Sequence, residues 1–217
     1  LTVPGGSITT DAIASNTFLG QSAGSSNTTG TQNTAVGNGT LQLNTTGANN
    51  NAFGHGALYA NTIGTYNNAF GLFALNSNTE GQNNIAIGTN ALRNSTTASN
   101  NNAVGGGALT SNTTGNNNVS DGYSALMNNT TGSSNTANGS FSLLANITGN
   151  HNTAVGHNAG HDSIGSNNVF LGHNAGYYET GDKKLHISIH GTDTLIYGDF
   201  ANHKVGISTP NPGQTLT

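Results

Sequence analysis

The segment Asn50-Asn51-Ala52-Phe53-Gly54 decides the fold, because close copies of it recur along the chain at a fixed interval of 17 residues. Only the last copy departs from this interval, arriving after 16 residues. A constant period of this length is the signature of a repeat protein. The ten copies end at Gly20, Gly37, Gly54, Gly71, Gly88, Gly105, Gly122, Gly139, Gly156 and Gly172.

The rest of each unit is patterned too, and the consensus is N-[TN]-A-[VFI]-G-x-x-A-L-x-x-N-T-T-G-x-x. Seventeen residues are too few for two helices with their loops, and the many glycines would break a helix. The unit therefore predicts one coil of a solenoid, with two short strands of about five residues each and glycines at corners that need a positive φ. The predicted fold class is all-β, a parallel β-solenoid (β-roll) of about ten such coils stacked about 4.8 Å apart, with asparagine ladders along its axis.

The composition excludes several classes of protein. Of 217 residues, 37 are Asn and 32 are Gly, only 6% are charged, and there is no Cys. Four Lys and Arg residues cannot form the positive surface that nucleic acids require, and no apolar run is long enough for membrane insertion. The few carboxylates are scattered and no phosphate-binding loop is present, so we expect neither an enzyme nor a cofactor.

The apolar content of one coil is small and bears on assembly. Each coil offers one Ala, one Leu and one Val, Ile or Phe, which is little apolar area against the entropy of ordering 17 residues at about 1 to 2 kcal/mol each. Three chains that pack their apolar columns around a common axis would form a larger core. We therefore expect a homotrimer.

The repeated A-V-G, A-I-G and A-F-G units, each preceded by Asn-Thr or Asn-Asn, resemble the head repeats of YadA-like trimeric autotransporter adhesins. The resemblance covers about residues 16–178 and implies a left-handed parallel β-roll that assembles as a trimer. The present unit differs from that family in its longer period and in the inserted A-L-x-x-N-T-T-G stretch.

A change in pattern near residue 179 divides the chain. We expect an N-terminal lead-in at 1–15, the solenoid at 16–178 and a β-rich connector at 179–217, where seven of the twelve charged residues lie. In the connector Leu185, Ile187 and Ile189 alternate with polar residues, as in a strand. The segments 195–200 and 204–210 resemble the connector of phage tail-fibre and surface-fibre proteins, which leads toward a C-terminal chaperone that is often cleaved off.

Three sets of residues are candidates for sites. The first consists of tyrosines that could anchor a protein or sugar receptor: Tyr59, Tyr66, Tyr123, Tyr177 and Tyr178. The second consists of His157 and His173, which should stack in adjacent coils. They form either a surface ladder, which the mixed residue types of their column favour, or a metal site if the column faces a trimer axis.

Asp121 is the third candidate, because it and Asn138 occupy the column otherwise filled by Val, Ile or Phe. A polar residue in a buried column is costly unless it is satisfied. Either these two coils enclose water or a cation near a trimer axis, or they form a local bulge or a wetter section of the rod.

Two functions remain. The first is a structural and adhesive fibre module, located outside the cell on a virion tail or a bacterial surface, which presents a surface to a host-cell receptor such as a glycan. The second is an ice-binding protein, because flat solenoid faces with regular threonines can order water. The paired threonines of the turns motivate it, and the interruptions at Ile63, Glu80 and Ile147 speak against it.

Overall fold

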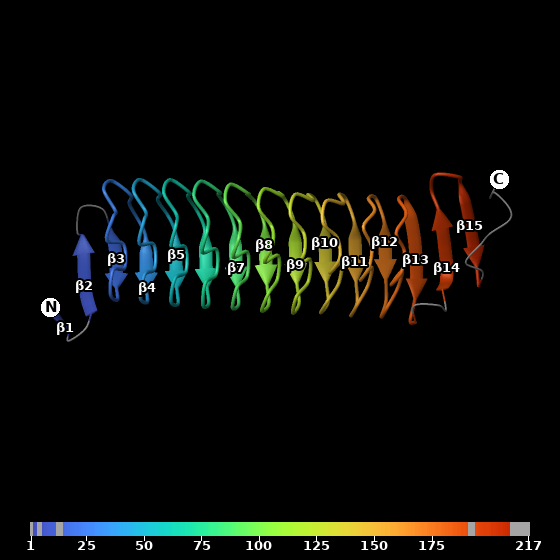
Figure 1. Cartoon of the computed structure of the whole chain (residues 1–217), viewed down its shortest axis with the longest axis horizontal. Helices are drawn as coiled ribbons and strands as arrows, with labels where there is room; N and C mark the ends of the chain where they lie inside the picture. Colours follow the sequence, from blue (N-terminus) through green and yellow to red (C-terminus); the bar gives the residue numbers. More distant parts are fainter. Residues whose placement is uncertain (1, 4–5, 12–14, 191–193, 209–217) are drawn as a thin grey trace.

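The computed structural model describes residues 2–3, 6–11, 15–190 and 194–208, which form a single elongated sheet in which the strands follow one another in sequence order (Figure 1). The described residues contain strands and turns and no helix, so the prediction of an all-β solenoid is confirmed. The strands are β1 (Thr2–Val3), β2 (Gly6–Asp11), β3 (Asn16–Leu19), β4 (Thr34–Val36), β5 (Asn51–Phe53), β6 (Asn68–Phe70), β7 (Ile85–Ile87), β8 (Asn102–Val104), β9 (Val119–Asp121), β10 (Thr136–Asn138), β11 (Thr153–Val155), β12 (Val169–Leu171), β13 (Lys184–Ser188), β14 (Thr194–Asp199) and β15 (Lys204–Ile207).

The strands from β3 to β13 pair in parallel, and each repeat position lies above its counterpart in the next coil. Ala52 pairs with Ala69, for example, and Phe53 pairs with Phe70. The parallel ladder continues past residue 179 as far as β13, which pairs with β12. The sheet changes to antiparallel pairing at both ends, between β2 and β3 and from β13 through β15.

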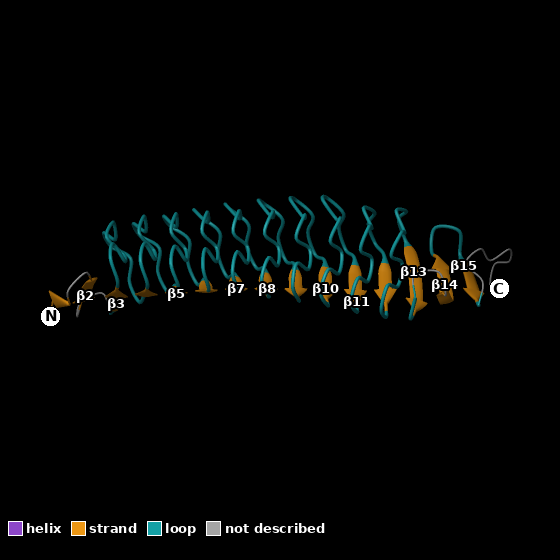
Figure 2. Cartoon of the chain, turned by 60° about the horizontal axis from the view of Figure 1, so that its bottom comes forward, coloured by secondary structure: helices purple, strands orange, loops and turns teal. Residues whose placement is uncertain are grey.

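Each coil contains one strand, so the prediction of two strands of about five residues per coil is wrong. The strands lie in a row along one side of the solenoid, and turns form the rest of each coil (Figure 2). The second half of the coil cannot extend, because positions such as Leu58 (φ 49°) and Tyr66 (φ 59°) are in the left-handed region. Its backbone still bonds from coil to coil, as when the Leu58 N–H donates to the Ala74 carbonyl at 3.0 Å.

The core within one chain consists of alanines and leucines. Ala69, Leu75 and their equivalents along the solenoid have no exposed surface. The Val, Ile and Phe residues lie outside this core of the single chain, and their burial in a core shared by three chains stays a prediction. They follow the buried Ala by one residue in the strand, so they point to the opposite face of the sheet, and Phe53, Phe70 and Ile87 remain 36%, 38% and 43% exposed.

The leucines of the core adopt an unusual backbone conformation. Seven of them, from Leu41 to Leu143, have φ between 48° and 51°. Residues branched at Cβ fit this left-handed region poorly. This explains why the apolar side chain in these seven coils is leucine, whereas valine and isoleucine occur in the outer column of the strands.

A buried asparagine ladder joins the coils, as predicted. The Asn84 side chain accepts a hydrogen bond from the Asn101 N–H at 3.0 Å and donates one to the Ala98 carbonyl at 2.8 Å. The same pair of bonds recurs at Asn67 and Asn101. Because the side chain has no exposed surface, these bonds exclude water.

Replacing Asn84 by Ala should lower the free energy of unfolding by about 2 to 4 kcal/mol, because the buried N–H of Asn101 and the carbonyl of Ala98 lose their partners. Chemical denaturation would measure this loss. The matched control is Asn94→Ala, since Asn94 is exposed and Ala60 and Ala145 stand at the same position of other coils. Equal stabilities of the two variants would contradict a structural role for the ladder.

At both ends of the core, one column carries a larger residue and the facing column carries a smaller one. Phe18 and Phe170 occupy the strand position that alanine holds in most other coils. Gly24, Gly160 and Gly176 occupy the position of the core leucines, and a Cβ at any of them would collide with one of these phenylalanine rings. A large residue in one column is thus matched by the loss of a side chain in the other.

A double-mutant cycle on Phe18 and Gly24 tests this exchange. Phe18→Ala alone should cost about 2 to 4 kcal/mol through the cavity that it leaves, and Gly24→Leu alone should be destabilising through overlap with the ring. The double variant restores the consensus Ala and Leu and should recover most of the lost stability. Additive losses in denaturation experiments would show that the two positions do not share the space.

Candidate functional site

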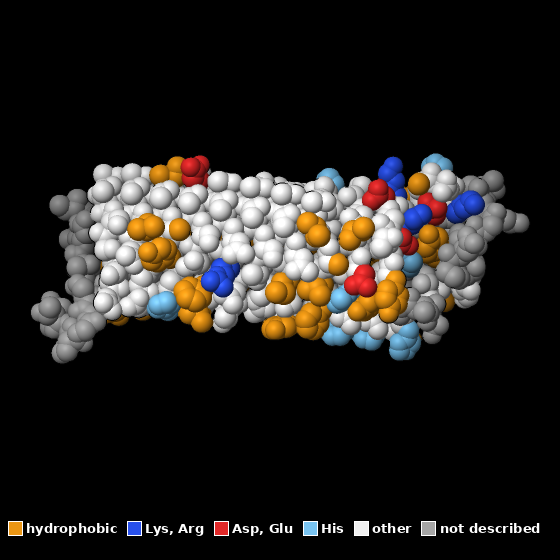
Figure 3. All heavy atoms as spheres, viewed as in Figure 1, with side chains coloured by type: hydrophobic (Ala, Val, Ile, Leu, Met, Phe, Trp, Pro, Cys, Tyr) orange, Lys and Arg blue, Asp and Glu red, His pale blue; other side chains and the backbone are white. Residues whose placement is uncertain are grey.

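The surface between the two ends is polar and almost uncharged. Figure 3 shows a face made largely of white, uncharged atoms, with Lys, Arg, Asp and Glu side chains gathered toward the C-terminal end. Within residues 15–178 the only charged side chains, with histidines counted as neutral, are Glu80, Arg93, Asp121 and Asp162. This surface therefore offers a ligand hydrogen-bonding groups and ring faces more than charge.

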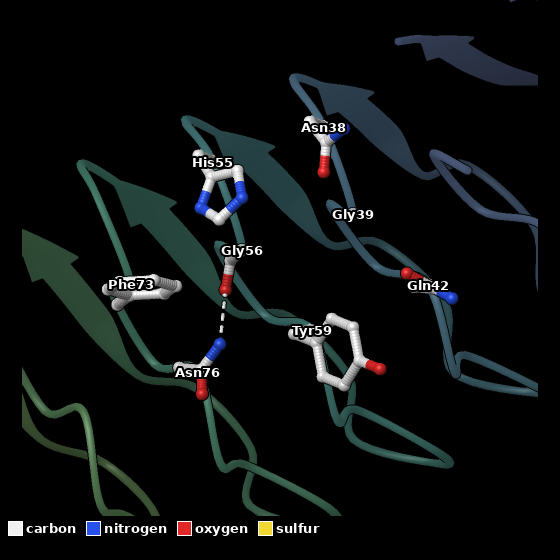
Figure 4. Close-up of a pocket in the computed structure, with 8 residues that line it drawn as sticks. All are labelled: Asn38, Gly39, Gln42, His55, Gly56, Tyr59, Phe73 and Asn76. Carbon is white, nitrogen blue, oxygen red and sulfur yellow. Dashed lines mark hydrogen bonds between the residues drawn. The ribbon is translucent and has the colours of Figure 1, made fainter. Parts of the chain in front are cut away.

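A recess of about 250 Å³ lies beside the ends of strands β4, β5 and β6 (Figure 4). Three rings from two successive coils border it, those of His55, Tyr59 and Phe73. Three side-chain amides complete the polar lining, those of Asn38, Gln42 and Asn76. We call this site the Tyr59 recess.

Three interactions hold its walls. The Asn76 Nδ2 donates a hydrogen bond to the Gly56 carbonyl at 2.8 Å, shown as a dashed line in Figure 4. The ring of His55 meets that of Phe73 edge to face at 5.1 Å, and the Arg93 guanidinium lies 5.1 Å from the centre of the Phe73 ring. These contacts constrain the rings of His55 and Phe73 before any ligand arrives.

Glycines open the recess. Gly39 and Gly56 have φ values of 65° and 66° and stand at the position that Phe73 or Asn90 holds in the next coils. A Cβ on Gly56 would come within 2.7 Å of the Phe73 ring. This position of the coil thus carries a side chain in some coils and a glycine in the two coils that open the recess.

A second recess of about 250 Å³ recurs three coils further on. Each of its lining residues except Tyr123 stands at the repeat position of a residue that lines the Tyr59 recess. Gly106 and Gly107 stand at the positions of His55 and Gly56. Tyr123 and Met127 provide the apolar surface there, so the two recesses share a shape and differ in chemistry.

The structure separates the candidate tyrosines. Tyr66, Tyr123 and Tyr178 are 56%, 60% and 71% exposed. Tyr59 and Tyr177 are half-buried, and they occupy the same position of the coil at opposite ends of the solenoid. Tyr177 stacks on His161 with ring centres 4.5 Å apart, and it also contacts Tyr178. Of the five, only Tyr59 lines the Tyr59 recess, and Tyr123 lines the second recess.

His157 and His173 stack in adjacent coils, as predicted, with ring centres 5.4 Å apart. Both are exposed and belong to a row of ring contacts that runs along one edge of the last coils. The row is Tyr123, Phe141, His157, His173 and His190. The surface ladder is confirmed for the single chain, and a metal site at a trimer axis stays a prediction.

Asp121 ends strand β9 and is exposed, as is Asn138 at the end of β10. Their column lies on the outer face of the sheet, so it is not buried within the single chain, and its burial near a trimer axis stays a prediction. In the described part of the chain, no group of three or more His, Asp or Glu residues is arranged to hold a metal ion.

The threonines of the turns are partly committed to the backbone. The hydroxyls of Thr45, Thr62 and Thr79 each donate to a carbonyl of the following coil, at 2.9 to 3.1 Å. The outer face of the sheet does not present this threonine column, because it carries the third strand positions, which are mostly apolar, beside the first positions, which are mostly Thr and Asn. Ice binding remains an untested hypothesis.

A Glu–His pair closes the C-terminal end of the core. His186 on β13 occupies the inward strand position next to Phe170 and is 8% exposed. Its Nε2 lies 3.0 Å from Glu179 Oε2, and its Nδ1 lies 3.4 Å from the hydroxyl of Thr194. The hydrogen bond from His186 lowers the pKa of Glu179 below its ordinary value, against the opposing effect of burial.

This pair predicts an acid-dependent stability. Because the pKa of Glu179 is lower in the folded chain than in the unfolded chain, its stabilising effect is present above about pH 4.3 and is lost as the pH falls through the lowered pKa. Glu179→Gln should lower the melting temperature at pH 7 by about 3 °C and flatten its decline in acid. Glu80→Gln, in an exposed turn, is the control, and a profile of Glu179→Gln parallel to that of the wild type would contradict the coupling.

Comparisons with protein families, curated proteins and solved structures found no match to this chain. The resemblance to YadA-like heads therefore stays a prediction. In the described residues there is no helix with the length and apolar character needed to cross a bilayer.

Proposed function

We propose that this chain is a structural and adhesive fibre module, which assembles as a homotrimer outside the cell and presents a binding surface to a host receptor. The observation that supports this most directly is an apolar stripe on the outer face of the sheet. It runs through strands β3 to β8 and resumes in β11 and β12, and its members are Leu19, Val36, Phe53, Phe70, Ile87, Val104, Val155 and Leu171.

The stripe has the features of an interface. Phe53 and Phe70 stack with ring centres 4.9 Å apart and planes within 7° of each other, which makes the surface flat. Soluble monomers rarely expose a continuous apolar surface along their whole length. Each side chain that is still about 40% exposed would contribute on the order of 1 kcal/mol if a neighbouring chain covered it.

The repeat favours a rotation axis parallel to the solenoid. With such an axis every coil meets the same coil of its neighbours, so the apolar positions of all layers coincide. Three copies is the number that the resemblance to YadA-like heads implies. Asp121 and Asn138 interrupt the stripe, and these layers would be the wettest part of the interface.

The solution mass tests the assembly. We expect light scattering to give about three times the chain mass of 21.8 kDa, before and after mild heating. Ile85 and Ile87 are both exposed on β7, so Ile85→Lys/Ile87→Lys places one cation in the stripe and one beside it on the same face of the sheet, and should yield monomers.

The matched control is Ile63→Lys/Ile147→Lys, which makes the same chemical change at exposed turn residues and should keep the trimer mass. A monomeric wild-type chain would contradict the assembly. Binding of labelled wild-type chain to a panel of host cells tests the adhesive part, and a trimer that binds no cell would be a spacer.

A further inference from the structure

The lining of the Tyr59 recess combines two chemistries. Three rings provide apolar faces and edges, and the amides of Asn38, Gln42 and Asn76 provide both donors and acceptors. The side chain of Gln42 makes no hydrogen bond within the described residues, and Asn76 uses only its Nδ2 there, leaving its carbonyl oxygen available. A ligand that suits this lining has an apolar face and several neutral hydroxyl groups at its edge.

Charge narrows the class of ligand. None of the lining residues is a carboxylate, lysine or arginine. The neighbouring Arg93 guanidinium lies over the Phe73 ring, where it faces an aromatic partner. The lining therefore offers no counter-charge for an acidic or a basic ligand, and it favours a neutral one.

The volume of the recess narrows the class of ligand further. At about 250 Å³ the recess is smaller than the roughly 300 to 1,000 Å³ of sites that hold drug-sized molecules. One sugar ring fits this space, whereas a folded peptide segment does not. The half-buried Tyr59 supplies a rigid ring on which the C–H face of a sugar can stack.

We propose that the Tyr59 recess binds one neutral hexopyranose unit of a glycan, with Tyr59 as the stacking platform and Gln42 and Asn76 as hydroxyl partners. This inference rests on the proposed adhesive function and identifies the class of its receptor. Gly39 and Gly56 are the specificity feature, because side chains at their positions would fill the site.

Ligand-observed NMR on the full chain tests the proposal, with methyl glycosides of glucose, galactose, mannose and N-acetylglucosamine as neutral probes and N-acetylneuraminic acid as the acidic probe. We expect at least one neutral probe to bind with a Kd on the order of 1 mM. Tyr59→Ala should weaken this binding at least tenfold. Tyr66→Ala, which removes an exposed tyrosine outside the recess, should leave it unchanged.

A second variant fills the recess and keeps the fold, so a loss of binding cannot be attributed to unfolding. Gly39→Asn introduces a residue that Asn90 and Asn158 already carry at the same coil position with φ near 60°. Its Cβ would rest 3.5 Å from the Tyr59 ring without collision, so the chain should fold and lose sugar binding. Gly107→Asn introduces the same residue at the same coil position outside the Tyr59 recess, and should leave sugar binding unchanged.

The outcomes separate the two proposals. Absence of binding by every neutral probe, preference for the acidic probe, or binding that survives both Tyr59→Ala and Gly39→Asn would each overturn the sugar site. None of these results would affect the trimer mass or the binding to cells, on which the proposed function depends.

Discussion

Hydrogen bonding between successive coils is the constraint on which the rest of the structure depends. A coil makes few bonds within itself, and its strand, its turns and its buried asparagines all bond to the coils above and below. The carbonyl and amide of one side chain, such as Asn84, are both used, so no other residue of similar size can replace it. This explains why asparagine, a residue that favours turns and is rarely buried, forms much of the interior of this chain.

The same constraint leaves little space for a core. Gly88, at the end of a strand, has φ 134°, and a Cβ there would lie 2.6 Å from the Gly105 carbonyl oxygen. Coils that approach this closely admit mainly small apolar residues and one larger one per layer, in most coils two alanines and a leucine in the left-handed region. Where a phenylalanine takes the alanine position, the leucine becomes glycine. Variation that changes the total volume is confined to the outside of the coil, and that is where residues differ between repeats.

The sequence was sufficient for the repeat, the parallel stacking, the asparagine ladders and the stacking of His157 on His173. The sequence did not show which strand residues face the core. A three-residue strand such as Ile85–Ile87 carries apolar side chains on both faces of the sheet, so the alternation of residues does not reveal the inner face. For this reason Asp121 was placed in a buried column. The Tyr59 recess depends on two glycines below rings of the following coils, and their φ values and contacts become apparent only when the coils are stacked.

The positions of the apolar stripe and the Tyr59 recess make assembly and recognition compatible. The stripe is formed by strand residues, whereas every residue that lines the recess lies outside the strands, on the turns that follow them. Chains that join through the outer face of the sheet would therefore make their contact with residues other than those that line the recess. A site for one neutral sugar gains little from charge and binds weakly, so useful affinity requires several sites on one rigid body. In the proposed trimer each chain would contribute one such site, so the assembly would supply several sites without a change in the site itself.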